Sequence, residues 1–375
     1  MPLEIRSAAT PPDFKRFVDL PYRLYKGDPL WVPPLKDDVR LLFNRTKNPF
    51  FEHAEVESFL AWKDGRVVGR IAAIDNRAHN EFHGDKVGFF GFFECEDDFE
   101  AAVALFDRAQ EWVRARGKDT LRGPMNFSTN DDCGSLIEGF DTPPAIMMPH
   151  NPPYHAGLYA AGGFAKEKDL VAYWYDGGVL PERMTRGIEL VRRRKGITVR
   201  SLDMKRYDAE VALIRTIYND AWERNWGFVP MTEKEIGHMA EQLKPVVVPD
   251  LIVFAEIRGE PVAFGLGLPD FNVALKHAHG ELFPFGFLSI LWHKRSIHRA
   301  RILTLGVRAG YRASGIDALL IAELYNRCVA RGIPKGEFSW ILEENLGMRR
   351  PLENLGATVY KTYRVYDRPI AGAGA

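Results

Sequence analysis

The sequence predicts an α/β protein made of two similar halves that follow one another along its 375 residues. Three observations lead to this prediction. Residues 59–76 and 253–272 each read as an apolar run, a tight turn and a second β-rich run, which is the pattern of a hairpin. Residues 101–117 and 315–332 each have helical spacing and end in Ala-Arg-Gly, where glycine is the expected terminator. The order of the elements after each of these helices is also the same.

Each half continues with a strand-like segment, a leucine-rich or aromatic stretch with a late glycine, and a strand-like tail. In the first half these are 120–127, 157–164 and 170–175, and in the second half 336–342, 352–357 and 358–366. Both halves therefore read helix, hairpin, strand, helix, strand, helix, strand, and we interpret them as a duplication. The repeat predicts a domain over 1–178, a helical linker over 179–196 and a second domain over 197–375, with Pro181 suited to the first turn of the linker helix.

Composition excludes several classes of protein. The 50 basic and 50 acidic side chains cancel, which argues against nucleic-acid binding driven by overall charge. Three scattered cysteines are too few for a disulfide framework or a zinc site, and the histidines form no metal-binding motif, so no metal is expected. The longest apolar run, Phe283–Trp292, is about half the length of a membrane span. With no apolar signal region at its start, the chain is expected to be cytoplasmic, with no membrane span.

The stretch between the strand Arg301–Val307 and the helix that begins near Ile316 is a candidate anion site. Its turn, Arg312-Ala-Ser-Gly315, places free backbone N–H groups at a helix N-terminus, which binds anions through those donors and the helix dipole. Gly315 allows close approach of the backbone, and Arg312 adds a positive fork suited to phosphate. The alternative is an ordinary strand-to-helix connection.

This stretch resembles the acetyl-CoA-binding motif of the GNAT superfamily of N-acetyltransferases, which reads Arg/Gln-x-x-Gly-x-Gly/Ala between a strand and a helix. Arg312, Gly315 and Asp317 stand at its three fixed places, with Asp317 replacing a small residue and expected to point away from the ligand. The later family motif also has a counterpart, in which Asn345 follows two glutamates and the helix ends in LENLGA. The tyrosine that often protonates the departing thiolate would align with Leu352, so that acid is missing from its usual place.

The resemblance covers residues 197 to about 369 and implies two tandem GNAT-like domains, each a mixed, mostly antiparallel twisted sheet flanked by helices. It implies that acetyl-CoA or another acyl-CoA is the co-substrate and that the acyl group passes to an amine of a small molecule or peptide. A backbone N–H at the end of the strand would polarise the thioester carbonyl. The residues expected to hold the co-substrate are Leu305, Gly306, Val307, Arg312, Ala313, Ser314, Gly315, Ile316, Asp317 and Asn345.

The general base and the substrate residues are less sharply predicted. Glu343 and Glu344 are the candidates for the base, although strand alternation turns only one of them toward the cleft and both could be solvated carboxylates. The loop 220–228 and the start of an insert at 270–296 are candidate substrate walls, or else segments whose aromatic residues pack on the core. The insert could alternatively form a lid over an apolar group. The candidate substrate residues are Asp220, Asn225, Trp226, Asp270 and Asn272.

The first half lacks the anion-binding loop. Before its helix stands Phe93–Glu100, which carries five carboxylates and no glycine and would oppose a pyrophosphate. We therefore expect this half to bind no CoA. Two alternatives to acetyl transfer stay open: an acyltransferase that uses a longer chain, donated by CoA or a carrier protein, to make an N-acyl amino acid, and a non-catalytic module that senses CoA or binds a partner. The oligomeric state is not predicted.

Overall fold

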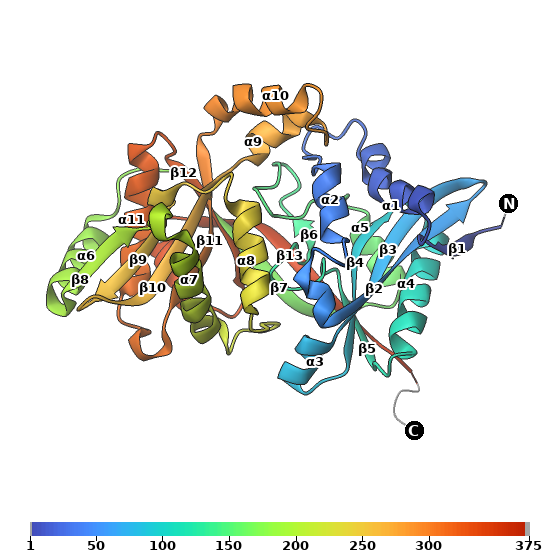
Figure 1. Ribbon diagram of the computed structural model, residues 1–375, viewed down its shortest axis with the longest axis horizontal. Helices are drawn as coiled ribbons and strands as arrows, with labels where there is room; N and C mark the ends of the chain where they lie inside the picture. The colour runs from blue at the N-terminus through green and yellow to red at the C-terminus, as the bar shows by residue number, and fades with distance from the viewer. Residues whose placement is uncertain (1, 372–375) are drawn as a thin grey trace. The chain divides into compact units, whose positions relative to one another are not determined.

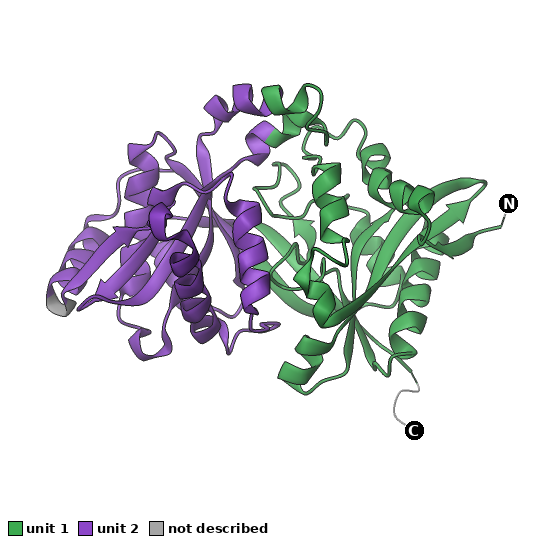
Figure 2. Ribbon diagram, viewed as in Figure 1, with its two compact units in different colours: residues 1–170, 275–288, 361–375 green, residues 171–274, 289–360 purple. Residues whose placement is uncertain are grey.

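The computed structural model describes residues 2–371, except for the side chains of residues 194 and 195 (Figure 1). Two compact units make up the chain, and neither is continuous in sequence. Unit 1 contains residues 1–170, 275–288 and 361–375, and unit 2 contains residues 171–274 and 289–360 (Figure 2).

Unit 1 is a mixed sheet with helices packed on it. Its strands lie in the order β1-β2-β3-β4-β5-β13, antiparallel except for β4 and β5, and β6 also pairs with β13. The apolar face of α4 packs on β2, β3 and β4 through fully buried side chains such as Leu105 and Phe106. The elements are β1 (Glu4–Ser7), α1 (Pro11–Leu24), α2 (Lys36–Leu42), η1 (Pro49–Glu52), β2 (Ala54–Lys63), β3 (Arg66–Asn76), α3 (Arg77–His83), β4 (Val87–Cys95), α4 (Phe99–Arg114), β5 (Thr120–Gly123), β6 (Ser135–Glu138), α5 (His155–Ala161), β7 (Ala165–Tyr175) and β13 (Thr358–Pro369).

The last strand of the chain completes the sheet of unit 1. Residues Tyr366–Pro369 of β13 pair antiparallel with Thr120–Gly123 of β5. The Arg122 guanidinium holds the Asp367 carboxylate with two hydrogen bonds of 2.8 and 2.7 Å across this pair. The second part of β7, from Val171, belongs to unit 2. The strands that end each half of the sequence are thus divided between the units.

Unit 2 has the strand order β7-β12-β11-β10-β9-β8, in which β8 to β11 are antiparallel and β11 and β12 are parallel. Its core forms where α11 lays Leu320 and Leu324 on β9 and β10. Its elements are α6 (Glu182–Lys195), β8 (Ile197–Ser201), η2 (Met204–Arg206), α7 (Tyr207–Trp222), α8 (Glu233–Leu243), η3 (Pro249–Leu251), β9 (Ile252–Ile257), β10 (Glu260–Pro269), α9 (Asn272–Leu275), α10 (Gly286–His293), η5 (Lys294–Ser296), β11 (Arg299–Val307), η6 (Ala309–Tyr311), α11 (Ile316–Ala330), β12 (Lys335–Leu342) and α12 (Leu346–Leu355). The end of α9, the start of α10 and all of η4 (Lys276–Ala278) belong to unit 1.

The predicted fold class is confirmed, with both hairpins and both Ala-Arg-Gly helices in place. The strand predicted over 120–127 ends at Gly123. The predicted linker helix forms as α6 but packs on α11 inside unit 2, with an ion pair of 3.0 Å between Arg192 and Glu323. The domain division at 178 and 197 stays a prediction about the sequence repeat.

Candidate active site

The two parallel strands of unit 2 pair over only part of their length. Hydrogen bonding joins Arg299–Ile302 of β11 to Lys335–Phe338 of β12, and within the described residues this ladder ends there. Opposite β10, the register of β11 shifts between Ile302 and Thr304, so Leu303 is the extra residue of a bulge. Beyond the bulge, β11 and β12 are no longer paired in the described part of the chain, and we call the opening between them the fork. The end of β11 on one side of it includes Leu305, Gly306 and Val307.

The predicted anion loop lies between β11 and α11, at the mouth of this fork. Ala313 and Gly315 have φ values of 53° and 79°, so the backbone turns through the left-handed region twice before α11 begins. In the part of the chain that the structure describes, the N–H groups of Ser314, Gly315 and Ile316 donate to no backbone carbonyl, and Ser314 Oγ has no hydrogen-bond partner. Successive free donors at a helix N-terminus form a concave anion site.

Gly315 is required here for two reasons. Its φ of 79° favours glycine, and a Cβ on it would lie 3.0 Å from Val191 Cγ2 of α6. The predicted linker helix thus forms the back wall of the loop.

Arg312 fixes the loop to the end of α7. Its Nη2 donates to the carbonyl oxygens of Asp220 and Ala221 at 3.2 and 2.9 Å, where a cation also suits the helix dipole. The Asp220 carboxylate accepts from the Ala309 N–H at 3.3 Å and lies 3.5 Å from Arg308 Nε. Asp220 therefore lies beside the predicted anion loop, and its contact with a substrate stays a prediction. A phosphate contact by Arg312 stays a prediction.

The prediction of one loop over 220–228 is wrong at its start, because α7 continues to Trp222. The Trp222 ring stacks on Tyr218 at 4.7 Å between centroids, and a Cβ on Gly306 would lie 2.5 Å from it. Packing on the core, the alternative considered for this segment, is thus correct for Trp222. Asn225 follows in a turn whose N–H donates to the Trp222 carbonyl at 2.7 Å, and Trp226 comes next, half-buried.

The other side of the fork carries the candidate base. Glu343 and Glu344 follow β12 directly, and Glu343 is half-buried whereas Glu344 is exposed. Arg349 Nη1 donates to the Glu343 carbonyl at 2.6 Å and so fixes this turn to α12. Asn345 is the N-cap of α12, where its Oδ1 accepts from the Met348 N–H at 3.2 Å. A contact of Asn345 with the co-substrate stays a prediction.

One candidate substrate position is closed. Leu352, at the place where the sequence predicts that the acid is missing, is fully buried in the core. Asp270 is also fully buried, and its Oδ2 accepts from Arg299 Nε at 2.6 Å. The other oxygen of Asp270 accepts from the Asn272 N–H at 3.1 Å, where α9 begins. This ion pair joins the ends of β10 and β11, and its carboxylate is closed to a substrate.

Sequence reasoning missed a buried polar network at the base of the fork. Arg301 and Glu337 are register partners on β11 and β12, and both are almost completely buried. The Arg301 guanidinium donates to the hydroxyl and carbonyl of Ser339 at 2.8 and 3.1 Å, and the hydroxyls of Ser339 and Tyr360 both donate to the Glu337 carboxylate. The signal was available, since charged residues stand inside two apolar strand sequences. The network holds the strands together just before they part.

Unit 1 has the same parallel pair, but its own chain fills the opening. After the pairing of β4 with β5 ends, the Met125 N–H donates to the Phe90 carbonyl at 2.8 Å and Asn126 Oδ1 accepts from the Phe92 N–H at 2.7 Å. The acidic stretch that precedes α4 is neutralised locally, as by Lys63, which lies 2.6 Å from Asp98. These contacts give a physical reason for the prediction that this half binds no CoA.

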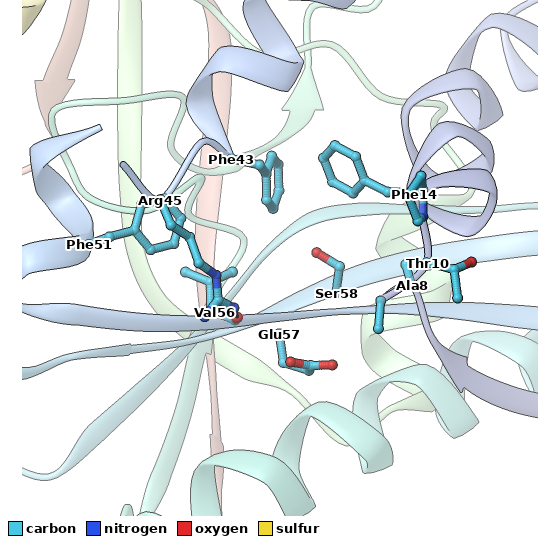
Figure 3. A pocket seen from close by; sticks show the side chains of 11 residues that line it. Ala8, Thr10, Phe14, Phe43, Arg45, Phe51, Val56, Glu57 and Ser58 are labelled. Carbon is cyan, nitrogen blue, oxygen red and sulfur yellow. Dashed lines mark hydrogen bonds between the residues drawn. The ribbon is translucent and has the colours of Figure 1, made fainter. Parts of the chain in front are cut away.

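A hollow of about 490 Å³ also opens in unit 1, and no predicted site residue lines it (Figure 3). Phe14, Phe43 and Phe51 are its aromatic lining residues, and Arg45 donates from Nη2 to the Val56 carbonyl at 2.8 Å beside it. Within the described chain, no group of three or more His, Cys, Asp or Glu side chains is placed to hold a metal ion, and no helix has the length and apolarity to cross a membrane.

The fold of the chain, with its fork and the loop before α11, is the tandem GNAT fold of N-acetyltransferases. It matches a tandem GNAT protein from the clavulanic acid biosynthesis pathway, with a TM-score of 0.57 and 13% identity over 100% of this chain and 99% of that one. A GCN5-related N-acetyltransferase from Sphaerobacter thermophilus has a TM-score of 0.52 and 15% identity, over 98% and 95% of the two chains.

The chain belongs to the family of two bacterial proteins that match it over nearly their whole length. The bacterial ceramide synthase of Caulobacter vibrioides is 40% identical over 98% of both chains. Protein YghO of Escherichia coli is 39% identical over 98% of this chain and 95% of its own. No model of a protein family matches the chain.

Proposed function

We propose that this chain is an acyl-CoA-dependent N-acyltransferase that joins a long acyl chain to the amino group of a long-chain base. The observation that carries the proposal is the 40% identity, over 98% of both chains, with the relative named bacterial ceramide synthase. A ceramide is the amide of a fatty acid and a long-chain amino alcohol, so its synthesis from a thioester is an acyl transfer to an amine.

The fork of unit 2 supplies groups for each part of this reaction. The free amides of Ser314, Gly315 and Ile316 would bind the CoA pyrophosphate. A backbone N–H of Leu305–Val307 would polarise the thioester carbonyl as the amine attacks it. The C–N bond forms, the C–S bond breaks and the amine proton passes to Glu343, directly or through water. The proton that Glu343 accepts then passes through water to the departing thiolate, which leaves as the thiol, because leucine at position 352 carries no acidic proton.

The test is a product assay with two donors and two acceptors. The purified protein is incubated with palmitoyl-CoA or acetyl-CoA and with sphinganine or a short-chain amine, and thiol release and the amide are measured. We expect the amide of palmitate and sphinganine to form fastest. Faster acetylation of the short amine would favour acetyl transfer, the first expectation from the sequence. Absence of thiol release with every pair would favour a carrier-protein donor or a CoA-sensing module.

A further inference from the structure

A group of large apolar side chains lies exposed along residues 283–292, here called the apolar segment. Phe283, Phe285 and Trp292 are 80%, 74% and 67% exposed. Phe287, Leu288 and Leu291 are also exposed, and α10, which carries four of these six side chains, has no buried residue. Exposed apolar side chains that are contiguous in this way mark a binding surface, whereas scattered ones are ordinary.

Positive charge follows the apolar segment directly, and one lysine, which donates to the Pro29 carbonyl, precedes it by seven residues. Lys276 precedes it and Lys294 and Arg295 follow it, and the Arg295 guanidinium lies 5.0 Å from the centroid of the Trp292 ring. Between residues 275 and 298 the sequence contains one carboxylate, Glu281, which is paired with Lys36 at 2.9 Å. The surface that fits this arrangement is apolar within and anionic at its boundary.

A lipid bilayer with anionic headgroups has this chemistry. The eight residues of α10 would extend only about 12 Å as a helix, too short to cross the bilayer but long enough to lie in its interface. Trp and Phe side chains favour that depth, and flanking Lys and Arg side chains reach the headgroup phosphates. We propose that the apolar segment inserts into the interface of an anionic membrane and docks the protein there. The docking is independent of the proposed function, although long-chain substrates would reside in the same surface.

The test is co-sedimentation with vesicles of phosphatidylcholine alone and vesicles that also contain phosphatidylglycerol. The apolar variant is Phe285→Ser/Leu288→Ser/Trp292→Ser, and its control is Leu190→Ser/Val329→Ser, which replaces side chains that are 48% and 44% exposed elsewhere. The charge variant is Lys294→Glu/Arg295→Glu, and its control is the adjacent exposed pair Lys205→Glu/Arg206→Glu. Circular dichroism and thermal unfolding check that every variant folds.

We expect the wild type to bind the mixed vesicles more tightly than the neutral ones. The apolar variant should lose at least about tenfold in affinity, and the charge variant about fivefold for each cation removed, on mixed vesicles only. Both controls should bind like the wild type. Absence of wild-type binding, or equal binding by the apolar variant, would overturn the proposal. Loss of a dimer in the apolar variant, with no vesicle binding by the wild type, would instead make the segment an interface between copies. An unaffected charge variant would overturn the requirement for anionic lipid.

Discussion

Two neighbouring carboxylates differ in their surroundings although they follow the same strand. Glu343 is half-buried on a turn that Arg349 fixes, whereas Glu344 is exposed. We expect Glu343→Gln to lower kcat about 100-fold with little change in KM, because a general base contributes about that much. Glu344→Gln should stay within about twofold of the wild type in the same steady-state assay. The opposite ranking would assign the base to Glu344.

A buried histidine in unit 1 predicts acid sensitivity. His155 is 1% exposed beside the Phe93 ring, and burial lowers its pKa to about 3. The unfolded chain binds its proton near pH 6.5, so this residue removes stability as the pH falls from about 6.5 toward 3. His155→Phe should reduce the loss of unfolding free energy by about 1.4 kcal/mol for each pH unit in that window. Thermal unfolding across this range, with the exposed His298→Phe as control, checks the prediction, and parallel curves would contradict it.

Residues whose role depends on local backbone were within reach of the sequence. Gly315 and Asn345 were selected by their places in the motifs that resemble the GNAT superfamily, and the structure places them at the starts of α11 and α12. Residues whose role depends on a distant partner were not. Arg312 donates to the carbonyl of Asp220, about 90 positions earlier in the chain. Asp270 accepts from Arg299, which comes later in the chain. The spacing of residues in the sequence does not indicate such contacts.

The fork between β11 and β12 depends on close contact between a strand and a helix. Gly306 leaves room for the Trp222 ring, which a Cβ would meet at 2.5 Å. We expect Gly306→Ala to cost about 1–3 kcal/mol through overpacking and to raise the KM for acyl-CoA by moving the strand end. Adding Trp222→Phe to the Gly306→Ala variant should restore part of the stability and lower the KM again.

A matched control lies on the neighbouring strand. At Gly336 the nearest atom to an added Cβ is 3.6 Å away, so Gly336→Ala should leave stability and KM unchanged. Chemical denaturation and steady-state kinetics measure both effects. Equal behaviour of the two alanine variants would show that the Trp222 contact does not shape the fork.

Elements with strong periodicity were predicted best, and their ends worst. Both hairpins and α11 follow from alternation, turn residues and glycine terminators. The end of α7 was placed too early because residues 220–228, rich in Trp, Asn and Asp, were interpreted as a loop between two helices. The helix continues because the guanidinium of Arg312 binds the carbonyls of its last turn.

At the scale of the whole molecule, the repeat in the sequence and the compact units differ. Similarity between the halves of the sequence predicts a duplication, but it cannot predict that β13 completes the sheet of unit 1. That pairing depends on side chains such as Arg122 and Asp367, which are 245 residues apart. The fold class was therefore predictable, whereas the division of the strands between the units was not, and anion binding by the loop before α11 stays a prediction.

The central claim is that the loop before α11 binds the phosphates of an acyl-CoA, and calorimetric titration of palmitoyl-CoA tests it most directly. Gly315→Glu places a bulky anion where the pyrophosphate would bind. Gly332→Glu is the matched control, since Gly332 also has a left-handed φ, of 75°, but no atom lies within 4 Å of an added Cβ. We predict that the wild type and Gly332→Glu bind alike and that Gly315→Glu binds at least about 100-fold more weakly. Equal binding by the two glutamate variants, or no binding by the wild type, would contradict the claim.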